Sequence, residues 1–297
     1  MNRDLTAKPV DSVWARVRGV FQLLRPRQWV KNGFVLAPLV FAGLFLDAYA
    51  VKQAILAMAL FSVASSATYI LNDLHDVERD RLHPTKSKSR PIAAGVVSPS
   101  LALLLMLVLY TVLFVSWFLW PQVVMVIGIY LIVNFTYTFF LKHQPVLDIF
   151  TIAIGFVLRI YAGAQAIGVP VSSWMFITTL CLALYLASVK RRQELTQSGV
   201  EGRRVLKHYS VALVDRYAEM SATGALIFYS LYVMEARPEL VVSIPLVLFG
   251  LFRYWYIVEA LDGGESPTDA LINDPALILA ILAWIGVCSW VLWPVKG

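Results

Sequence analysis

Four oxygen-bearing side chains recur at short spacing where a long apolar run ends. In NDLHDVERD, Asn72, Asp73, Asp76 and Asp80 follow one another at intervals of one, three and four residues. If the helix of the apolar run continues through them, they share an arc of about 100°, and Glu78 points the other way. Several oxygen ligands on one surface suit a hard divalent cation that also binds water and phosphate. The spacing therefore predicts a metal site at Asp73, Asp76 and Asp80, with Asn72 beside it as a candidate substrate-binding residue.

Cations surround and follow these carboxylates, and they allow a second interpretation. The carboxylates of a solvated helix end could simply pair with Arg79, Arg81 and Lys86. Like charges on one stripe beneath a membrane helix repel one another unless a cation is present, which favours the metal. In HPTKSKSRPIAAG, Lys86, Lys88 and Arg90 alternate with small hydroxyl residues. They could bind phosphate oxygens beside a metal or contact anionic lipid, and both alternatives stay open.

The elements that must position these residues are membrane helices. The chain has 297 residues, of which 59% are hydrophobic and 15% charged, and its mean hydropathy is +0.70. This is too apolar for a soluble domain, and a lipid bilayer admits only helices or closed barrels. Runs near the roughly 20 residues that a spanning helix needs recur along the chain. We therefore predict an all-α polytopic integral membrane protein with nine transmembrane helices, near residues 33–47, 53–71, 99–119, 121–141, 147–168, 173–189, 213–233, 240–259 and 275–294.

Basic residues predict how this bundle is oriented. With the N-terminus inside, 20 of the 25 Lys and Arg residues fall on the cytoplasmic side, and only Lys52, Arg237 and Lys296 fall outside. Short loops retain basic residues in the cytoplasm. The polar loops 72–98 and 190–212 are then cytoplasmic, and an odd number of helices leaves the C-terminus outside. We expect the protein in the cell (inner) membrane, with its chemistry facing the cytoplasm.

The N-terminal region differs from the rest of the chain. We divide the sequence into a cytoplasmic segment, residues 1–32, and a single transmembrane helical domain, residues 33–297. Within the first segment, one apolar face at helical spacing predicts an interfacial helix, with Arg16 and Arg18 off that face. A disordered basic tail is the alternative. The apolar residues are Trp14, Val17, Phe21 and Leu24.

Other charged residues lie at or within the predicted helices. Asp148 and Arg159 are eleven residues apart and nearly share a face, and ionisable groups there are costly and usually functional. We expect Arg159 to border a polar cavity and reach a phosphate, and Asp148 to cap the helix that follows Pro145. Three cations lie at the entrance to the first helix: Arg25, Arg27 and Lys31. They could contact substrate or simply mark the inner surface, and both alternatives stay open.

A tyrosine and an acidic loop are the remaining candidate site residues. Tyr185, shortly before the second basic loop, is a candidate substrate-binding residue. Gly and Pro interrupt EALDGGESPTDALINDPAL, so we expect Asp262, Asp269 and Asp274 to belong to a solvated loop rather than to a metal site.

These motifs together resemble the UbiA superfamily of intramembrane prenyltransferases. The resemblance lies in NDxxDxxxD, in RPIAAG shortly after it, and in RPRQWVKNGFVLAPLVFAG before the first helix, and it covers most of the chain. It implies a nine-helix bundle with a cytoplasm-facing polar cavity. Members typically carry a second aspartate motif after the sixth helix, and the two motifs hold Mg²⁺ on an allylic diphosphate. Here YLASVKRRQELTQSG has Lys190, Arg191, Arg192 and Glu194 instead.

That departure, with DIFTIAIGFVLRIYAGA and KRRQEL, resembles the decaprenyl-phosphate phosphoribosyltransferase branch. The resemblance implies phosphoribosyl diphosphate (PRPP) as donor, a polyprenyl phosphate as acceptor and Mg²⁺ as cofactor. Lys190, Arg191 and Arg192 would bind a phosphate of either substrate. The product would be a lipid-linked pentose for cell-wall arabinan. We expect contact with membrane lipid and no nucleic-acid partner, and homo-oligomer formation stays open.

Two other functions compete with this one. An aromatic prenyltransferase of the same superfamily would use a polyprenyl diphosphate donor, but the missing second acidic motif argues against it. A transporter or channel would have charges at mid-bilayer and broken helices. Here the polar groups gather at one surface instead.

Overall fold

The structure is a helical bundle. The computed structural model describes residues 13–82, 86–198, 204–260 and 273–293, and within these ranges it contains helices and no strands. A helix satisfies its backbone hydrogen bonds internally, as a lipid environment requires. The predicted all-α class is therefore confirmed.

Six helical segments of the described residues are long and apolar enough to cross a membrane. Two further helices accompany them, α10 (Val211–Ala236) and the shorter apolar α13 (Pro275–Val291). A multi-pass membrane protein is confirmed, whereas the count of nine spanning helices stays a prediction. The six segments are α3 (Ala48–His75), α6 (Pro99–Trp117), α7 (Pro121–Phe139), α8 (Leu147–Ile167), α9 (Ser173–Ser198), and η5 (Pro238–Ser243) with α11 (Ile244–Ala260).

The prediction of a transmembrane helix at residues 33–47 is wrong. The chain instead forms a 3₁₀ helix, η1 (Pro26–Leu36), then the short α2 (Ala37–Phe41), and turns at Gly43, where φ is +69°. Runs of 3₁₀ helix as long as η1 are uncommon and need tertiary support. Gly163 of α8 provides it, because a Cβ there would lie 1.9 Å from the carbonyl oxygen of Val35. This close approach to α8 is invisible in the hydropathy of the segment.

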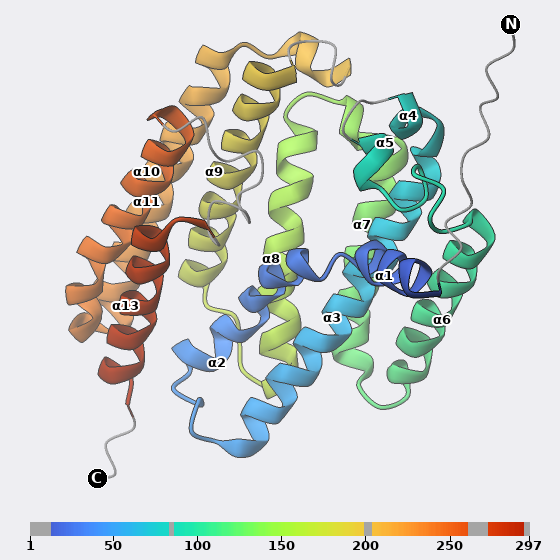
Figure 1. The fold of residues 1–297 in the computed structure, drawn as a ribbon. Coiled ribbons are helices and arrows are strands. Elements are labelled where there is room, and N and C mark those ends of the chain that lie inside the picture. The colour runs from blue at the N-terminus through green and yellow to red at the C-terminus, as the bar shows by residue number, and fades with distance from the viewer. Residues whose placement is uncertain (1–12, 83–85, 199–203, 261–272, 294–297) are drawn as a thin grey trace, which may run out of the picture.

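α8 occupies the middle of the bundle (Figure 1), where it packs against α3, α7 and α9. Phe61 of α3 and Tyr130 of α7 belong to one buried cluster with Val35 and Ala162. A second cluster joins α9 to α10, α11 and α13 on the other side of the bundle. The short helices α4 (Val77–Leu82) and α5 (Lys86–Ser89) lie together at one end. The apolar packing thus holds the ends of α3, α8 and α9 in fixed relation.

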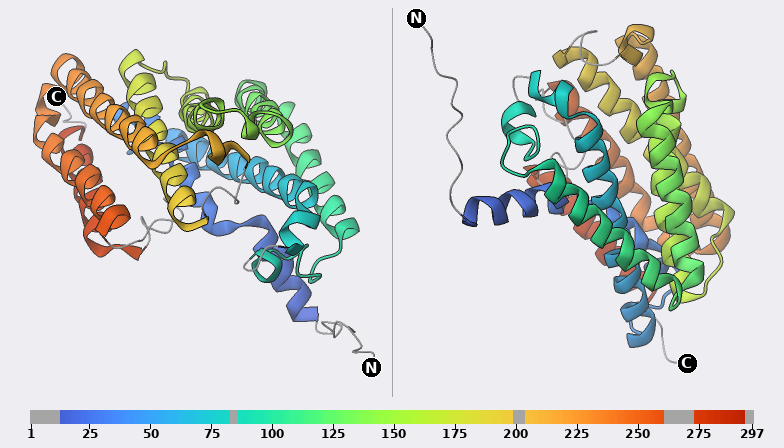
Figure 2. Two further views of the ribbon diagram at one scale, coloured as in Figure 1. Left: turned by 90° about the horizontal axis from the view of Figure 1, so that it is seen from above. Right: turned by 90° about the vertical axis from the view of Figure 1, so that its right-hand side faces the viewer.

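The N-terminal helix α1 (Val13–Leu24) projects from the side of the bundle, as both views of Figure 2 show. The side of α1 that faces the bundle packs closely against it. Leu23 is fully buried, and a Cβ on Gly19 would lie 2.6 Å from Val96 Cγ1. Trp14, Val17 and Phe21 are exposed. Such an uncovered apolar face suits a helix that lies in a membrane surface. Its interfacial placement stays a prediction.

Candidate active site

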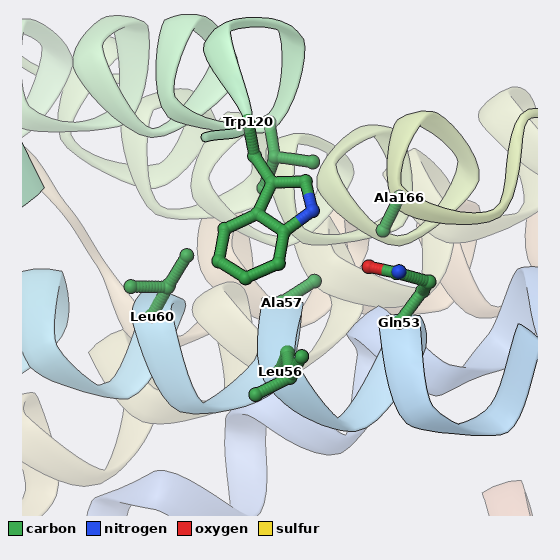
Figure 3. Close-up of a pocket in the computed structure, with 7 residues that line it drawn as sticks. Gln53, Leu56, Ala57, Leu60, Trp120 and Ala166 are labelled. Carbon is green, nitrogen blue, oxygen red and sulfur yellow. The ribbon is translucent and has the colours of Figure 1, made fainter. Parts of the chain in front are cut away.

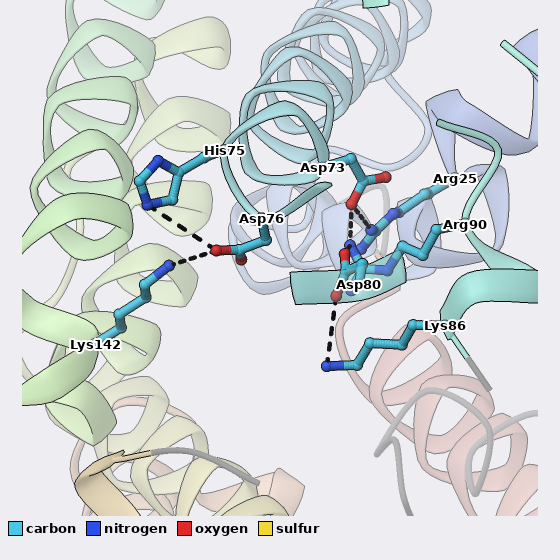
Figure 4. A network of polar contacts seen from close by, with 8 residues as sticks. All are labelled: Arg25, Asp73, His75, Asp76, Asp80, Lys86, Arg90 and Lys142. Carbon is cyan, nitrogen blue, oxygen red and sulfur yellow. Dashed lines mark hydrogen bonds and ion pairs between the residues drawn. The ribbon is translucent and has the colours of Figure 1, made fainter. Parts of the chain in front are cut away.

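The carboxylate motif lies on two helices that meet at Asp76. α3 ends at His75, Asp76 caps it with φ −94° and ψ 7°, and α4 begins at Val77. The prediction of one uninterrupted helix through Asp80 is therefore wrong. Asp73 and Asp80 both contact Arg90, and Asp76 points to another side (Figure 4).

Asp73 and Asp80 are buried among cations. They are 2% and 3% exposed. Arg25 Nη2 lies 2.5 Å from Asp73 Oδ1, and Arg90 Nη1 donates to the same oxygen. Arg90 Nη1 is also 3.6 Å from Asp80 Oδ2, and Lys86 Nζ is 3.9 Å from Asp80 Oδ1. Residues from three segments of the chain thus build one compact cluster of alternating charge, as Figure 4 shows.

One oxygen of each buried carboxylate remains without a hydrogen-bond donor. Asp73 Oδ2 and Asp80 Oδ2 are buried, and neither has a hydrogen-bond partner. Buried acceptors of this kind are costly unless water or an ion satisfies them. Arg90 Nη1 compensates the charge of Asp80 Oδ2 from 3.6 Å, without a hydrogen bond. Burial raises the pKa of Asp80, although the Lys86 ammonium opposes that rise. Mg²⁺ is commonly bound by one or two carboxylates with water and substrate phosphates, so Asp73 and Asp80 are ligands of the type that this ion prefers.

Asp76 is directed away from that pair. Its Oδ1 lies 3.1 Å from Lys142 Nζ and 4.0 Å from His75 Nε2. No three His, Cys, Asp or Glu side chains gather to hold a metal anywhere in the described ranges. The predicted metal site of Asp73, Asp76 and Asp80 is thus not assembled in this conformation. Lys142 lies in η2 (Leu141–His143), and the only sign of it in the sequence was its position in a short polar turn between two apolar runs.

The neighbouring candidates occupy different environments. The Thr138 hydroxyl donates to Asn72 Oδ1, which ties α3 to α7. Glu78 points to solvent as the spacing predicts, with its side chain 81% exposed and 2.9 Å from Arg81. Lys88 is exposed on α5, and Lys31 is partly buried in η1. Asn72 therefore has a structural contact, and the two lysines stay candidates for phosphate binding.

Arg159 is buried deep in the bundle. Its Nε donates to Asn32 Oδ1 at 2.9 Å, and Nη1 donates to the Gly155 carbonyl at 2.7 Å. The guanidinium also lies about 5 Å from the rings of Phe61, Tyr130 and Phe156. Aromatic rings attract a buried cation in this way. Arg159 links η1 to α8, and its predicted contact with phosphate stays a prediction.

The prediction that a cytoplasmic loop begins at residue 190 is wrong, because α9 continues to Ser198, and acids neutralise two of its cations. Arg191 is fully buried, with its Nε 2.5 Å from Asp148 Oδ2 and its Nη1 donating to Glu194. Arg192 Nε lies 2.9 Å from Asp215, and Glu259 accepts from its Nη2. Two of the three predicted phosphate-binding cations are therefore engaged within the protein.

Residues 35–273 match the UbiA prenyltransferase family. The chain belongs to this family. It is 35% identical to the decaprenyl-phosphate phosphoribosyltransferase of Mycobacterium tuberculosis, with 96% of this chain and 97% of that protein covered. Identity to the protein of the same name from Mycolicibacterium smegmatis is 34%, with 91% of each covered. A UbiA homologue from Archaeoglobus fulgidus bound to GPP and Mg²⁺ shares the fold, with a TM-score of 0.70, 19% identity, and coverage of 93% of this chain and 100% of that one.

Asp148 of this UbiA chain is not the helix cap that the sequence predicts. Val146 is the N-cap of α8 and makes no side-chain cap hydrogen bond. The Asp148 carboxylate is fully buried and accepts from Arg191 and from the Tyr209 hydroxyl. The prediction fails because the guanidinium comes from α9, 43 residues further along the chain.

Tyr185 and Lys190 occupy different positions on α9 of the UbiA bundle. Tyr185 is 2% exposed, donates to the Leu251 carbonyl at 3.1 Å and stacks on Trp255. It belongs to the packing of α9 against α11. Lys190 is partly buried beside Arg191. Lys190 is therefore the stronger substrate candidate of the two.

The acidic loop of the UbiA chain is only partly described. Asp262 and Asp269 lie outside the described residues. Asp274 caps α13 by accepting from Leu277 N at 2.8 Å, and it pairs with Arg253 at 2.7 Å. Its role is therefore structural.

A cleft of about 300 Å³ lies at the opposite end of the UbiA bundle, where α3 and α7 begin and α8 ends. Gln53, Gln122 and Gln165 line it together with Trp120. A smaller pocket beside it shares Gln53 and Trp120 and is lined by Leu56 and other apolar residues (Figure 3). Amides and apolar side chains provide neither the carboxylates nor the cations that a diphosphate requires, so the candidate active site is the carboxylate cluster.

Proposed function

We propose that the chain transfers a 5-phosphoribosyl group from PRPP to a polyprenyl (decaprenyl) phosphate and releases diphosphate. The observation that carries the proposal is the pair of buried carboxylates, Asp73 and Asp80, among Arg25, Lys86 and Arg90. The names of relatives that match most of the chain support the same reaction. The product would be a lipid-linked pentose precursor for cell-wall arabinan.

The reaction mainly requires the protein to supply positive charge. An oxygen of the lipid phosphate forms a bond to the anomeric carbon of ribose, and the bond from that carbon to diphosphate breaks with its electron pair. Mg²⁺ at Asp73 and Asp80 would neutralise charge on the departing diphosphate. Arg25 and Arg90 present forked donors that match phosphate oxygens. A phosphate monoester is largely deprotonated near neutral pH, so no side chain has to act as a base.

Asp76 is the third proposed ligand of this metal-diphosphate unit. It would have to leave Lys142, whose Nζ lies 3.1 Å away, to join Asp73 and Asp80. The released ammonium would then be available to a phosphate oxygen. Lys31, Lys88 and Lys190 remain proposed phosphate ligands of the same site.

An aromatic prenyltransferase that uses a polyprenyl diphosphate is the alternative. It would have to stabilise a carbocation, which the Lys190 ammonium at the end of α9 does not favour, whereas acids already neutralise Arg191 and Arg192. Lys190, Arg191 and Arg192 occupy the place of the second acidic motif. This favours a reaction that brings two phosphate-bearing substrates together.

Purified protein in lipid vesicles distinguishes the two donors. We expect label from PRPP to appear in the lipid fraction when polyprenyl phosphate and Mg²⁺ are present, and chelation of the metal should abolish the transfer. The control is a labelled allylic diphosphate with an aromatic acceptor, which should give no product. Transfer from the allylic diphosphate with none from PRPP would contradict the proposal and support the alternative.

We also propose the cell membrane as the location, with the N-terminus and carboxylate cluster cytoplasmic and the C-terminus outside. The 20 basic residues assigned inside support this orientation. In Figure 1, α13 ends far from the end of the bundle that carries α4 and α5. A reporter fused to the C-terminus should be active only outside the cytoplasm, with an N-terminal fusion as the control. Cytoplasmic activity of the C-terminal reporter would contradict the orientation.

A further inference from the structure

Arg191 lies at the centre of a buried network that uses its whole guanidinium. Nε bonds Asp148 at 2.5 Å, Nη1 bonds Glu194, and Nη2 donates to the Tyr137 hydroxyl at 3.2 Å. The side chains of Arg191 and Asp148 are both fully buried. Breaking a buried ion pair leaves an uncompensated charge and is strongly unfavourable. Arg191 is therefore poorly suited to leave its partners for a substrate phosphate.

The other oxygen of Asp148 extends this network to a third helix. The Tyr209 hydroxyl donates to Asp148 Oδ1 at 2.6 Å and accepts the backbone N–H of Val146 at 2.6 Å. Tyr209 directly follows η4 (Arg204–His208) and precedes Ser210, the N-cap of α10. The network thus joins the beginnings of α8 and α10 to the end of α9.

Val146 adopts a backbone conformation that this network must maintain. Its φ is +69° and its ψ is −48°, a region that β-branched residues rarely occupy. Such strain persists only where surrounding contacts over-determine it, and it is often associated with functional sites. Here the conformation directs the Val146 N–H to Tyr209. The hydroxyl therefore has two defined partners, and removing it would release the turn.

The same turn carries the contact to the carboxylate cluster. Lys142 lies four residues before Val146, and its Nζ is 3.1 Å from Asp76. A single short connection between α7 and α8 therefore touches Asp76 on one side and the Arg191 network on the other. Displacement of this connection would move both Lys142 and the end of α9 that carries Lys190.

We propose that Asp148 and Tyr209 are positioning residues: they hold Arg191 and the α7–α8 turn so that Lys142 and the end of α9 are placed for the phosphates of the donor. Arg191 then acts as a buried anchor and not as a phosphate ligand. This inference rests on the proposed phosphoribosyl transfer and adds a role to groups that do not touch the reacting atoms.

Tyr209→Phe tests the proposal, with Tyr229→Phe as its matched control. Both changes remove one largely buried tyrosine hydroxyl, and that of Tyr229 bonds Ser243 at 2.6 Å within a cluster of α10, η5 and α13. We expect Tyr209→Phe to raise the KM for PRPP about tenfold, with kcat changed less than twofold, because a hydrogen bond to a charged group is lost. Tyr229→Phe should lower Tm by a similar amount but leave KM and kcat unchanged. Asp148→Asn should repeat the KM effect.

The results for Tyr209→Phe distinguish a positioning role from a purely structural one. An unchanged KM in this variant would overturn the proposal, as would aggregation of the variant, which would make Tyr209 a stability residue only. Kinetics of the unaltered protein are measured first with PRPP. If it uses an allylic diphosphate instead, the proposed function fails, and the KM contrast between the two variants with that donor still decides whether the network positions the site.

Discussion

Asp73→Asn should lower kcat by about a thousandfold, which is the scale on which an electrostatic group acts when charge develops in a transition state. Asp73 accepts from both Arg25 and Arg90, and its Oδ2 has no hydrogen-bond partner. An amide in its place would lose the charge that holds these cations and would bind Mg²⁺ weakly. Label transfer from PRPP at saturating substrate and several Mg²⁺ concentrations measures the effect.

Glu78→Gln is the matched control for that change. It also converts a carboxylate of the same motif to an amide, but the Glu78 side chain is 81% exposed and pairs with Arg81 at the surface. Surface ion pairs of this kind contribute little. We expect activity within about twofold of the unaltered protein. Similar losses in both variants would contradict the assignment of the site to the buried pair Asp73 and Asp80.

Gly163→Ala should destabilise the protein by about 3 kcal/mol and remove most activity, because overpacking of a rigid contact has this cost. The new Cβ would lie 1.9 Å from the Val35 carbonyl oxygen and 2.8 Å from its carbon, so η1 would have to move away from α8. η1 begins directly after Arg25, whose guanidinium binds Asp73. The measurements are Tm in detergent and transfer from PRPP.

Gly128→Ala provides the comparison. Gly128 lies in α7, and a Cβ there would have no atom within 4 Å. Alanine is favoured over glycine within helices by roughly 0.5–1 kcal/mol, so Tm should stay the same or rise slightly and activity should be retained. A Gly163→Ala protein as stable and active as Gly128→Ala would show that η1 does not depend on this close approach.

Periodicity and composition predicted the features that depend on neighbours in the sequence. Apolar runs determine where most of the long helices lie, because a bilayer requires continuous apolar length and internal backbone hydrogen bonds. The hairpin between Trp117 and Pro121 is present as predicted, since proline favours the first turn of a helix. Glu78 also points away from Asp73 and Asp80, as helical spacing within a few residues requires.

Only the tertiary structure decided which charges meet. One partner of Asp73 is Arg25, 48 residues earlier, and one partner of Asp148 is Arg191, 43 residues later. The sequence determined that carboxylates gather near the end of one membrane helix and cations near the end of another, because that is a matter of residue order. Whether a cation is available to a substrate or neutralised within the protein depends on helices packing side by side, and hydropathy carries no information about that pairing.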